Sequence, residues 1–345
     1  MSQKPINATQ IAKLAGVSRS TVSKVINNYP DIPEDTKAKV LSVIEKHKYQ
    51  PNAFAQVLKG VPQTVIALYA YAYEVDMETD SLSSLESPYV MGIISNFIKA
   101  AKNHNHKLVV ELIEFGDNEQ EVEAQIRKDF DSKTIAAAVF LGLSNDVKFI
   151  DNLIDDDYRI AVIDREIKEA KTSVNIFTDD FGGARLAVEH LYKQGFNSIA
   201  FIGGSDNKHS AQSRLEGYRS AVYEADAEQI VFEALFSEKS GKEAAQKVLG
   251  MTSRPDAFVC AADVIAYGFI QTLREHDPDY LNRIGIVGFD NSPFNQYQRP
   301  ALSSVGVDFS QIARTTIEAL LGSAETKKYI VPMSLHKRDS SSTGR

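Results

Sequence analysis

Residues 7–27, with the sequence NATQIAKLAGVSRSTVSKVIN, constrain the fold more than any other part of the chain. Gly16 stands where two short helical patterns must reverse direction, and glycine tolerates the positive φ that such a turn needs. Asn7 and Gln10 form a capping-box pattern for the first helix, and Ser18 can cap the second. We expect two helices joined by a tight turn, with these apolar residues facing each other: Ile11, Ala12, Leu14, Ala15, Val17, Val22, Val25 and Ile26.

A third short helix is predicted after Pro33, which cannot cap a helix through its side chain. Its apolar residues would close a small three-helix core. An ordinary three-helix unit with a solvated face is the plainer interpretation of this segment. The core residues expected from this helix are Val40, Leu41, Val43 and Ile44.

The second helix would turn short polar side chains outward at its N-terminal end, namely Arg19, Ser20, Thr21, Ser23 and Lys24. A helix of this kind can enter the DNA major groove and bring such groups to base edges. The distribution of charge agrees with this interpretation. Residues 1–60 contain nine Lys and Arg and four Asp and Glu, which gives this segment a net charge of +5. The whole chain has a net charge of −8, so residues 61–345 carry −13. A basic head can meet phosphates, whereas the acidic body cannot.

The chain resembles the lactose-repressor/galactose-repressor family of bacterial transcription regulators. The most specific matches are Ala15–Ser18 (AGVS), Thr21–Asn27 (TVSKVIN) and Tyr49–Asn52 (YQPN). The resemblance implies a homodimer that binds a near-palindromic DNA operator. The residues that it assigns to DNA binding are Thr9, Ser18, Arg19, Ser20, Thr21, Ser23, Lys24, Asn27, Tyr49, Asn52, Ala55 and Leu58.

The resemblance also implies three parts: an all-α helix-turn-helix head at 1–49, a hinge helix at 50–61, and a two-lobed α/β body at 62–345 that is like periplasmic binding proteins. A hinge helix of about seven residues is unstable alone in water, so we expect it to form only on DNA beside its partner copy. Leu58 would then wedge into a base step of the minor groove. A plain linker is the alternative.

The body alternates apolar runs with amphipathic helical runs, which predicts parallel sheets with crossover helices in two lobes. Strands are expected at 64–71, 108–115, 135–141, 160–164, 198–203, 257–261 and 284–289. Helices are expected at 90–103, 120–131, 181–194, 213–225, 240–249, 264–275 and 310–321.

Charged residues stand where several predicted strands end, which is where open parallel sheets bind ligands. Asp and Arg side chains there could bind sugar hydroxyls through paired hydrogen bonds. Asp164 and Asp263 could equally cap following helices, and Phe236 and Phe309 could belong to the core. The positions that the resemblance assigns to effector contact are Pro88, Tyr89, Asp164, Arg165, Arg214, Phe236, Asp263, Asp290 and Phe309.

Two departures from the family pattern concern this site. Ala262 occupies a position that is often Asn in sugar-binding members, so one amide is missing. The loop 73–87 is longer and more acidic than usual, and it could cover the pocket or be a solvated insertion.

The sequence offers no enzyme motif, cofactor fingerprint or metal cluster. Cys260 is the single cysteine and lies in an apolar run, and the seven His are scattered. No run of 18 apolar residues and no leader is visible, which predicts a cytoplasmic protein and argues against a periplasmic sugar carrier. The expected function is a repressor of carbohydrate-metabolism genes, controlled by a sugar or sugar-derived effector. Control by a partner phosphocarrier protein, and an activator or corepressor-type regulator, remain alternatives.

The wedge assignment predicts that Leu58→Ala weakens operator binding far more than binding to random DNA. Loss of the inserted side chain removes the contact that is specific to the bent site, while phosphate contacts are unchanged. Titration of both duplexes at one salt concentration measures the two effects, and equal losses would contradict the wedge.

Overall fold

The computed structural model describes residues 8–26, 29, 32–47, 65–71, 88–114, 116–143, 147–204, 208–322 and 328–342. The chain divides into two compact units, Met1–Gln63 and Thr64–Arg345, called here the head and the body. Several sequence predictions lie outside the described residues: the cap Asn7, the DNA-contact candidates Asn27, Tyr49, Asn52, Ala55 and Leu58, the hinge 50–61, and the whole of the loop 73–87.

The head contains the three predicted helices, α1 (Ala8–Ala15), α2 (Arg19–Ile26) and α3 (Glu34–Lys46). Gly16 has φ +66°, as the turn requires. The Ser18 hydroxyl accepts a hydrogen bond from the Thr21 backbone N–H at 3.0 Å and so caps α2. Pro33 precedes α3 and makes no side-chain cap bond. The buried core is formed by Ile11, Ala12, Val22, Val25 and Val40.

Two predicted core residues of the head are in fact exposed. Leu14 is 53% exposed and Leu41 is 46% exposed. Each of these residues lies on the flank of its helix. Leu41, for example, follows the buried Val40 by one residue, which rotates its side chain by roughly 100° around the helix axis. Apolar character alone therefore overestimated the width of the buried face.

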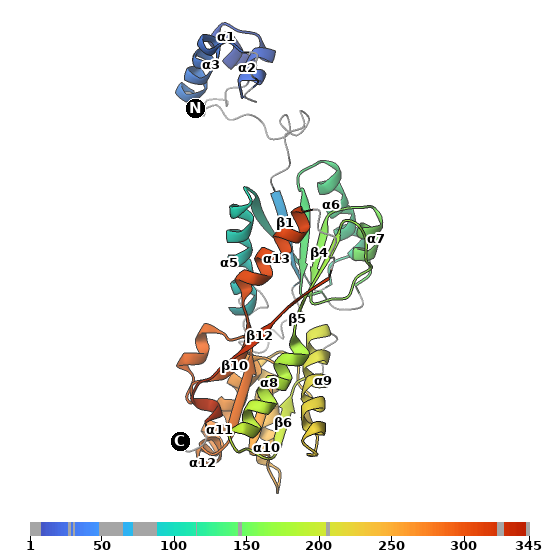
Figure 1. Cartoon of the computed structure of the whole chain (residues 1–345), viewed down its shortest axis with the longest axis vertical. Helices are drawn as coiled ribbons and strands as arrows, with labels where there is room; N and C mark the ends of the chain where they lie inside the picture. Colours follow the sequence, from blue (N-terminus) through green and yellow to red (C-terminus); the bar gives the residue numbers. More distant parts are fainter. Residues whose placement is uncertain are drawn as a thin grey trace. The chain divides into compact units, whose positions relative to one another are not determined.

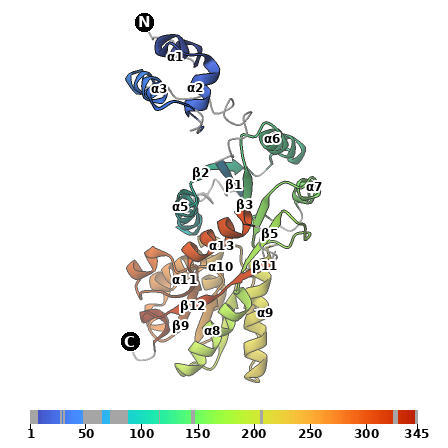
Figure 2. The ribbon, with the colours of Figure 1, turned by 45° about the horizontal axis from the view of Figure 1, so that its top comes forward.

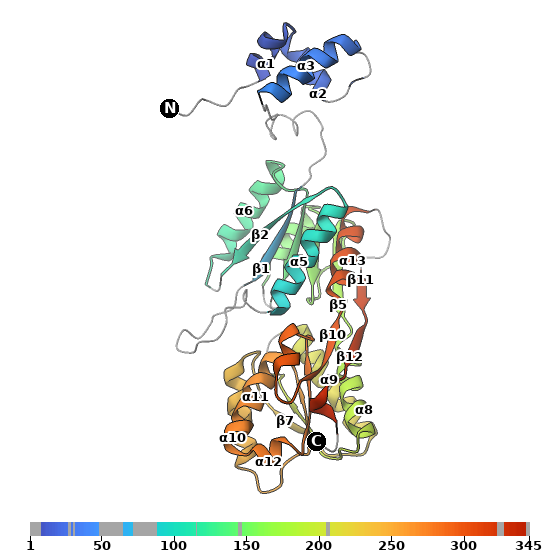
Figure 3. The ribbon, with the colours of Figure 1, turned by 90° about the vertical axis from the view of Figure 1, so that its left-hand side faces the viewer.

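The first lobe of the body is built on a six-stranded parallel sheet in the order β11-β5-β4-β3-β1-β2. Helices α5 and α13 cover one face, and α6 and α7 cover the other (Figure 1 and Figure 3). The strands are β1 (Val65–Tyr71), β2 (Lys107–Ile113), β3 (Ala137–Leu141), β4 (Ile160–Ile163), β5 (Ser173–Thr178) and β11 (Lys328–Val331). The helices are α5 (Pro88–Asn103), α6 (Glu119–Asp131), α7 (Phe149–Asp155) and α13 (Phe309–Leu321).

The second lobe has a six-stranded sheet in the order β12-β10-β9-β8-β6-β7, in which β12 alone runs antiparallel to its neighbour. Helices α8 and α9 lie side by side, as do α10 and α11 (Figure 1 and Figure 2). The strands are β6 (Ile199–Ile202), β7 (Ile230–Phe232), β8 (Ala257–Cys260), β9 (Gly285–Phe289), β10 (Ser303–Val307) and β12 (Met333–His336). The helices are α8 (Asp180–Lys193), α9 (His209–Glu224), α10 (Glu238–Leu249), α11 (Asp263–His276), α12 (Pro278–Leu281) and the 3-10 turns η1 (Pro293–Tyr297) and η2 (Asp339–Ser341).

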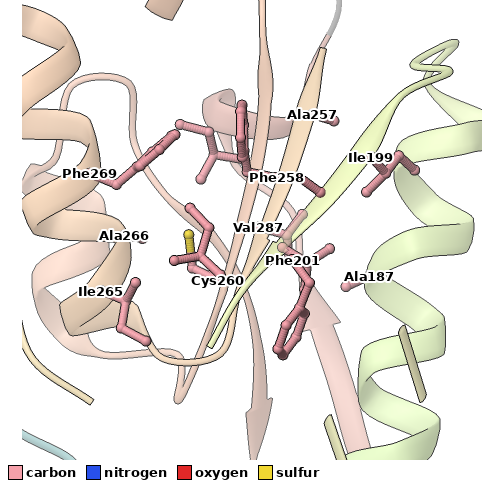
Figure 4. Close-up of a cluster of buried hydrophobic side chains, with 14 of the residues drawn as sticks. Ala187, Ile199, Phe201, Ala257, Phe258, Cys260, Ile265, Ala266, Phe269 and Val287 are labelled. Atoms are coloured by element: carbon pink, nitrogen blue, oxygen red, sulfur yellow. The ribbon is translucent and has the colours of Figure 1, made fainter. Parts of the chain in front are cut away.

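The core of the second lobe is aromatic and aliphatic. Figure 4 shows Phe258, Phe269 and Val287 grouped around the strands, and the Phe258 and Phe269 rings lie 4.6 Å apart. Cys260 is completely buried in this core, as its apolar surroundings in the sequence predicted. Such a thiol acts as a small apolar side chain.

The chain crosses between the two lobes after β5, after β10 and after β11. These crossings confirm the two-lobed architecture expected from the resemblance. Ligand sites in such sheets lie at the carboxyl ends of the parallel strands. The crossings therefore bring polar residues of both lobes to one place.

Several boundaries differ from the prediction. Helix α9 begins at His209, so Arg214 lies in its second turn and not at its start. Strands β5 and β10 were not predicted, because buried polar residues interrupt their apolar pattern. In β10, Ser303 and Ser304 are fully buried, and their hydroxyls donate to the Arg338 carbonyl and to Asp263. Strands β7, β11 and β12 and helices α7 and α12 were also missed, since each is short.

In the part of the chain that the structure describes, no helix combines the length and apolar character needed to span a bilayer.

Helix α10 packs closely against α11, so we predict that Gly268→Ala lowers the free energy of unfolding of the body by about 1–3 kcal/mol. This loss is expected even though alanine has a higher helix propensity than glycine. A Cβ at Gly268 would lie 2.0 Å from the carbonyl oxygen of Glu238. Gly250→Ala is the control, because its Cβ would meet nothing closer than 3.5 Å. Urea unfolding measures both variants, and equal stability would contradict the clash.

Candidate functional site

A buried ion pair joins the first crossing segment to the second lobe. Arg214 donates from Nε to Asp180 Oδ1 and from Nη1 to the Ala261 carbonyl, each at 2.6 Å. Its Nη1 also lies 3.7 Å from Asp290 Oδ1. The side chains of Arg214 and Asp180 are 6% and 0% exposed. Arg214 therefore links the start of α8 to the ends of β8 and β9.

The first lobe contributes Asp164 and Tyr89 to the same place. Asp164 follows β4 with φ +59°, a left-handed conformation that aspartate tolerates better than most residues. Its Oδ1 accepts from the Thr178 N–H at 3.4 Å, and its Oδ2 accepts from the Tyr89 hydroxyl at 3.5 Å. Thr178 Oγ1 lies 3.3 Å from Asp164 Oδ1 but only 2.5 Å from Asp180 Oδ2. We call Tyr89, Asp164, Asp180, Arg214 and Asp290 the cleft cluster.

Charge crowding in the cleft cluster perturbs its carboxyl groups. Burial and the neighbouring Asp180 raise the pKa of Asp164 to about 7, against the opposing effect of Arg214. Burial also raises the pKa of Asp290, while Arg214 partly lowers it. Burial alone would lower the pKa of Arg214, but Asp180 and Asp290 hold it above its ordinary value. The guanidinium thus stays charged, and the pKa of Asp164 lies near neutral pH.

Aromatic rings surround the cluster. The guanidinium carbon of Arg214 lies 4.4 Å from the Phe289 ring centroid and 5.9 Å from that of Phe236, distances at which a cation is attracted to the ring. Tyr89 and Phe309 meet edge to face with centroids 5.4 Å apart. Phe236 and Phe309 are each partly buried against a hydrophobic core, and each also borders the cleft cluster. The core interpretation and the effector-contact interpretation therefore each describe part of their environment.

A groove of about 950 Å³ adjoins the cluster between the lobes. Three predicted effector residues line it, Pro88, Asp290 and Phe309. The floor also includes the start of α13 and strand β12. A volume of this order is enough for a small organic ligand.

Two predicted residues lie elsewhere. Arg165 turns away from the cluster, donates to the Val147 carbonyl and lies 4.0 Å from Asp151. Asp263 is buried inside the second lobe and accepts from the Ser292 N–H, the Asn295 amide and the Ser304 hydroxyl at 2.7–2.8 Å. Neither Asp164 nor Asp263 caps a helix: the chain runs from Asp164 to strand β5, and α11 begins without a side-chain cap bond.

Sequence reasoning missed Asp180 and Thr178. The sequence Ser173–Thr178 is followed by two aspartates, Asp179 and Asp180. Had this run been identified as a buried strand, carboxyl groups at its end would have marked it as a site. The polar residues within it, above all the buried Asn175, hid the strand.

In the head, the described DNA-contact candidates are all exposed or half-buried. Thr9, Ser18, Arg19, Ser20 and Lys24 are exposed, while Thr21 and Ser23 are half-buried. The Ser18 hydroxyl is 2.6 Å from that of Ser20 and 2.9 Å from that of Thr21. Ser18 therefore positions the first turn of α2 in addition to any contact that it makes itself.

Among the residues whose placement is described, no group of three His, Cys, Asp or Glu side chains is arranged to bind a metal ion.

Comparisons with known proteins agree with both units. Residues 9–52 match the model of bacterial regulatory proteins of the lacI family, and residues 188–341 match a periplasmic binding protein-like domain. The probable HTH-type transcriptional repressor ExuR of Bacillus subtilis (strain 168) is 28% identical, over 92% of this chain and 91% of its own length. It is a regulator and not an enzyme.

Solved structures share the fold. The lac repressor dimer bound to operator and the anti-inducer ONPF superposes with a TM-score of 0.83, with 22% identity over 99% of this chain and all of the other. The transcriptional regulator CelR in complex with cellobiose gives a TM-score of 0.69, with 23% identity over 97% and 99% of the two chains. At these identities the likeness establishes the architecture.

The raised pKa of Asp164 predicts that Asp164→Asn stabilises the body at pH 8. The folded protein binds this proton up to about pH 7 and the unfolded chain only to about pH 3.8, so the carboxyl group destabilises the fold increasingly as pH rises between these values. We expect a gain of at most about 4 kcal/mol at pH 8, shrinking toward pH 5.

Asp157→Asn is the matched control, since Asp157 has the same φ of +59° on an exposed turn. Denaturant unfolding at both pH values measures the difference. The titratable groups that act on Asp164 are Asp180 of α8 and Arg214 of α9, and the Tyr89 hydroxyl of α5 donates to it. A gain that is equal at pH 5 and pH 8 would show that Asp164 is ionised throughout.

Proposed function

Because the chain belongs to the lacI family of bacterial regulatory proteins, we propose that it is a transcription repressor whose affinity for operator DNA is controlled by a small sugar-like effector bound in the body. The relatives supply the general class, a repressor with a helix-turn-helix head. The effector, its site and the genes under control are the parts that we propose.

The cleft cluster is the observation that carries the proposal. Tyr89 and Asp164 come from the first lobe and Arg214 and Asp290 from the second, while Asp180 begins α8, where the chain enters the second lobe. A ligand bound beside these residues would contact both lobes at once. Carboxylates and a guanidinium suit a ligand with several hydroxyl groups, because each can make paired hydrogen bonds.

A sugar is the preferred effector class. The aromatic rings of Phe236 and Phe309, which are only partly buried and lie next to charged groups, are suited to a molecule with both apolar C–H faces and polar edges. The CelR neighbour is described as a cellobiose complex, which supports this class for the fold. We therefore propose control of carbohydrate-metabolism genes in the cytoplasm.

For DNA recognition we propose that α2 enters the major groove. Arg19 and Ser20 at its N-terminal end are exposed, as base contact requires. Two copies would read the two halves of a near-palindrome. The large exposed apolar residues of α5 and of the matching face of the edge strand β2, Met91, Ile98, Val110 and Leu112, offer a surface through which two bodies can associate.

Selection of binders from a random duplex library tests the DNA part of the proposal. We expect the full-length protein to enrich a motif with two-fold symmetry. Arg19→Ala should cost about 1–3 kcal/mol on that motif and relax the preference at one position in each half. Lys37→Ala on α3 is a control for general loss of positive charge. Failure of the wild-type protein to enrich any motif would contradict the proposed function.

A further inference from the structure

One corner of the first lobe is basic, although the body as a whole is acidic. Residues 88–110 contain three lysines and no Asp or Glu, whereas residues 61–345 carry a net charge of −13. The three side chains, Lys99, Lys102 and Lys107, are exposed, and we call them the basic corner. Within the described part of the chain, no carboxylate forms an ion pair with any of them. Their charges are therefore available to a partner.

The direction of the chain brings these lysines to one edge of the first lobe. Helix α5 follows β1 and leads into the parallel strand β2, so its last turn lies beside the N-terminal ends of both strands. Lys99 and Lys102 are three residues apart and share a face of α5. Lys107 opens β2 and pairs in register with Val65, the first residue of β1. The basic corner thus lies at the edge opposite the carboxyl ends of the strands, away from the cleft cluster.

A tight turn holds the backbone of the corner. Asn105 has φ +59°, and the His106 N–H donates to the Ala101 carbonyl at 2.8 Å, which closes the last turn of α5. His106 Nδ1 also lies 2.7 Å from the His104 carbonyl oxygen. Because the backbone between α5 and β2 is fixed in this way, only the lysine side chains lose freedom when a partner binds.

The carboxyl groups at this edge belong to other parts of the lobe. Helices α6 and α7, which cover the opposite face of the sheet, lead into Asp129, Asp131, Asp155, Asp156 and Asp157. The first four already have partners in the lobe, which are Gln125, Tyr158, Lys168 and Arg127 in that order. On the face of α5, Glu318 lies near the end of α13, and α13 packs on β4, β5 and β11 at the far side of the sheet from β2. The positive charge of the corner is therefore not cancelled locally.

We infer that the basic corner is a second DNA-contact surface, through which the body binds phosphates of the duplex that the head holds. This inference rests on the proposed DNA-binding function and adds a site to it. The chain that comes from the head enters the body at β1, whose first residue pairs with Lys107, so a bound duplex is tethered to this edge. Lysine ammonium groups bind phosphate as point charges and read no bases. The corner therefore adds affinity for DNA without sequence preference.

Association of two bodies would place two such corners together. The apolar surface proposed for association includes Ile98, which precedes Lys99 directly, and Val110, three residues after Lys107. Six lysines gathered at the end of this surface would repel one another, and DNA phosphates would relieve that repulsion. Binding of DNA and association of the bodies would then favour each other by the same free energy.

The salt dependence of DNA binding by the full-length protein tests the inference. The variant carries Lys99→Gln, Lys102→Gln and Lys107→Gln, and the duplexes are the selected operator motif and a random sequence of equal length. Each phosphate contact that is lost lowers the slope of log Kd against log[KCl] by about 0.9. We expect the slope to fall by at least about 1 on both duplexes, with weaker binding at low salt and an unchanged ratio between the two affinities.

Two matched variants separate a local contact from a general effect of charge. Arginine at the same three positions keeps the charge and should keep the slope of the wild-type protein. Glutamine at Lys239, Lys242 and Lys247 of α10 removes the same charge from the second lobe and should leave the slope unchanged.

An unchanged slope for the corner variant would overturn the inference and leave the proposed function standing, and the corner would then suit an acidic protein surface. An equal fall for the α10 variant, or a loss confined to the operator motif, would also overturn it. If the wild-type protein binds neither duplex, the proposed function is wrong, and the inference falls with it. Should the triple variant fail to fold, Lys102→Gln alone decides by the same measurement.

Discussion

The ion pair between Arg214 and Asp180 is the constraint around which the body is arranged. Burying two charges is costly unless each is well paired and hydrogen-bonded, and here both conditions hold. Arg214 also donates from Nη1 to the Ala261 carbonyl and approaches Asp290, so the start of α8 and two strand ends of the second lobe share one cation. Removing Arg214 would leave the Asp180 carboxylate buried without its cation, whereas removing Asp180 would leave Arg214 with only the more distant Asp290.

The acidic residues of the body differ in how many hydrogen bonds their carboxyl groups already accept, and this difference distinguishes their roles. Asp263 accepts three short hydrogen bonds and fixes the loop after β9, so little capacity is left for a ligand. Asp180 is engaged by Arg214 and Thr178. Asp164 and Asp290 lie on opposite lobes, and both have positive φ. These two carboxyl groups keep more capacity to accept hydrogen bonds from a ligand than Asp180 and Asp263 do. A ligand that joins them would favour one angle between the lobes, and a coupling of about 1–3 kcal/mol would suffice to change operator occupancy.

Much of this arrangement could be predicted. Regular apolar runs gave the strands β1, β3, β8 and β9 closely, because these strands are buried on both faces and read as continuous hydrophobic stretches. Strands β5 and β10 escaped prediction since their buried Asn175, Ser303 and Ser304 break the pattern, and these polar groups are tolerated only through partners distant in sequence. The prediction that Leu14 is buried was wrong for the opposite reason, because this apolar side chain is exposed.

By itself the sequence determined the helix-turn-helix, the alternating α/β body and the strand-end carboxyl groups Asp164 and Asp290, because helical spacing, glycine at the turn and charged groups at strand ends are local properties. Tyr89 and Arg214 were expected in the cleft from the family resemblance. Only the tertiary structure decided which of those residues act together. It brought in Asp180, turned Arg165 away and enclosed Asp263, since the direction of a side chain depends on the lobe against which it packs. The charge balance of the site follows from those long-range contacts, and no local pattern contains it.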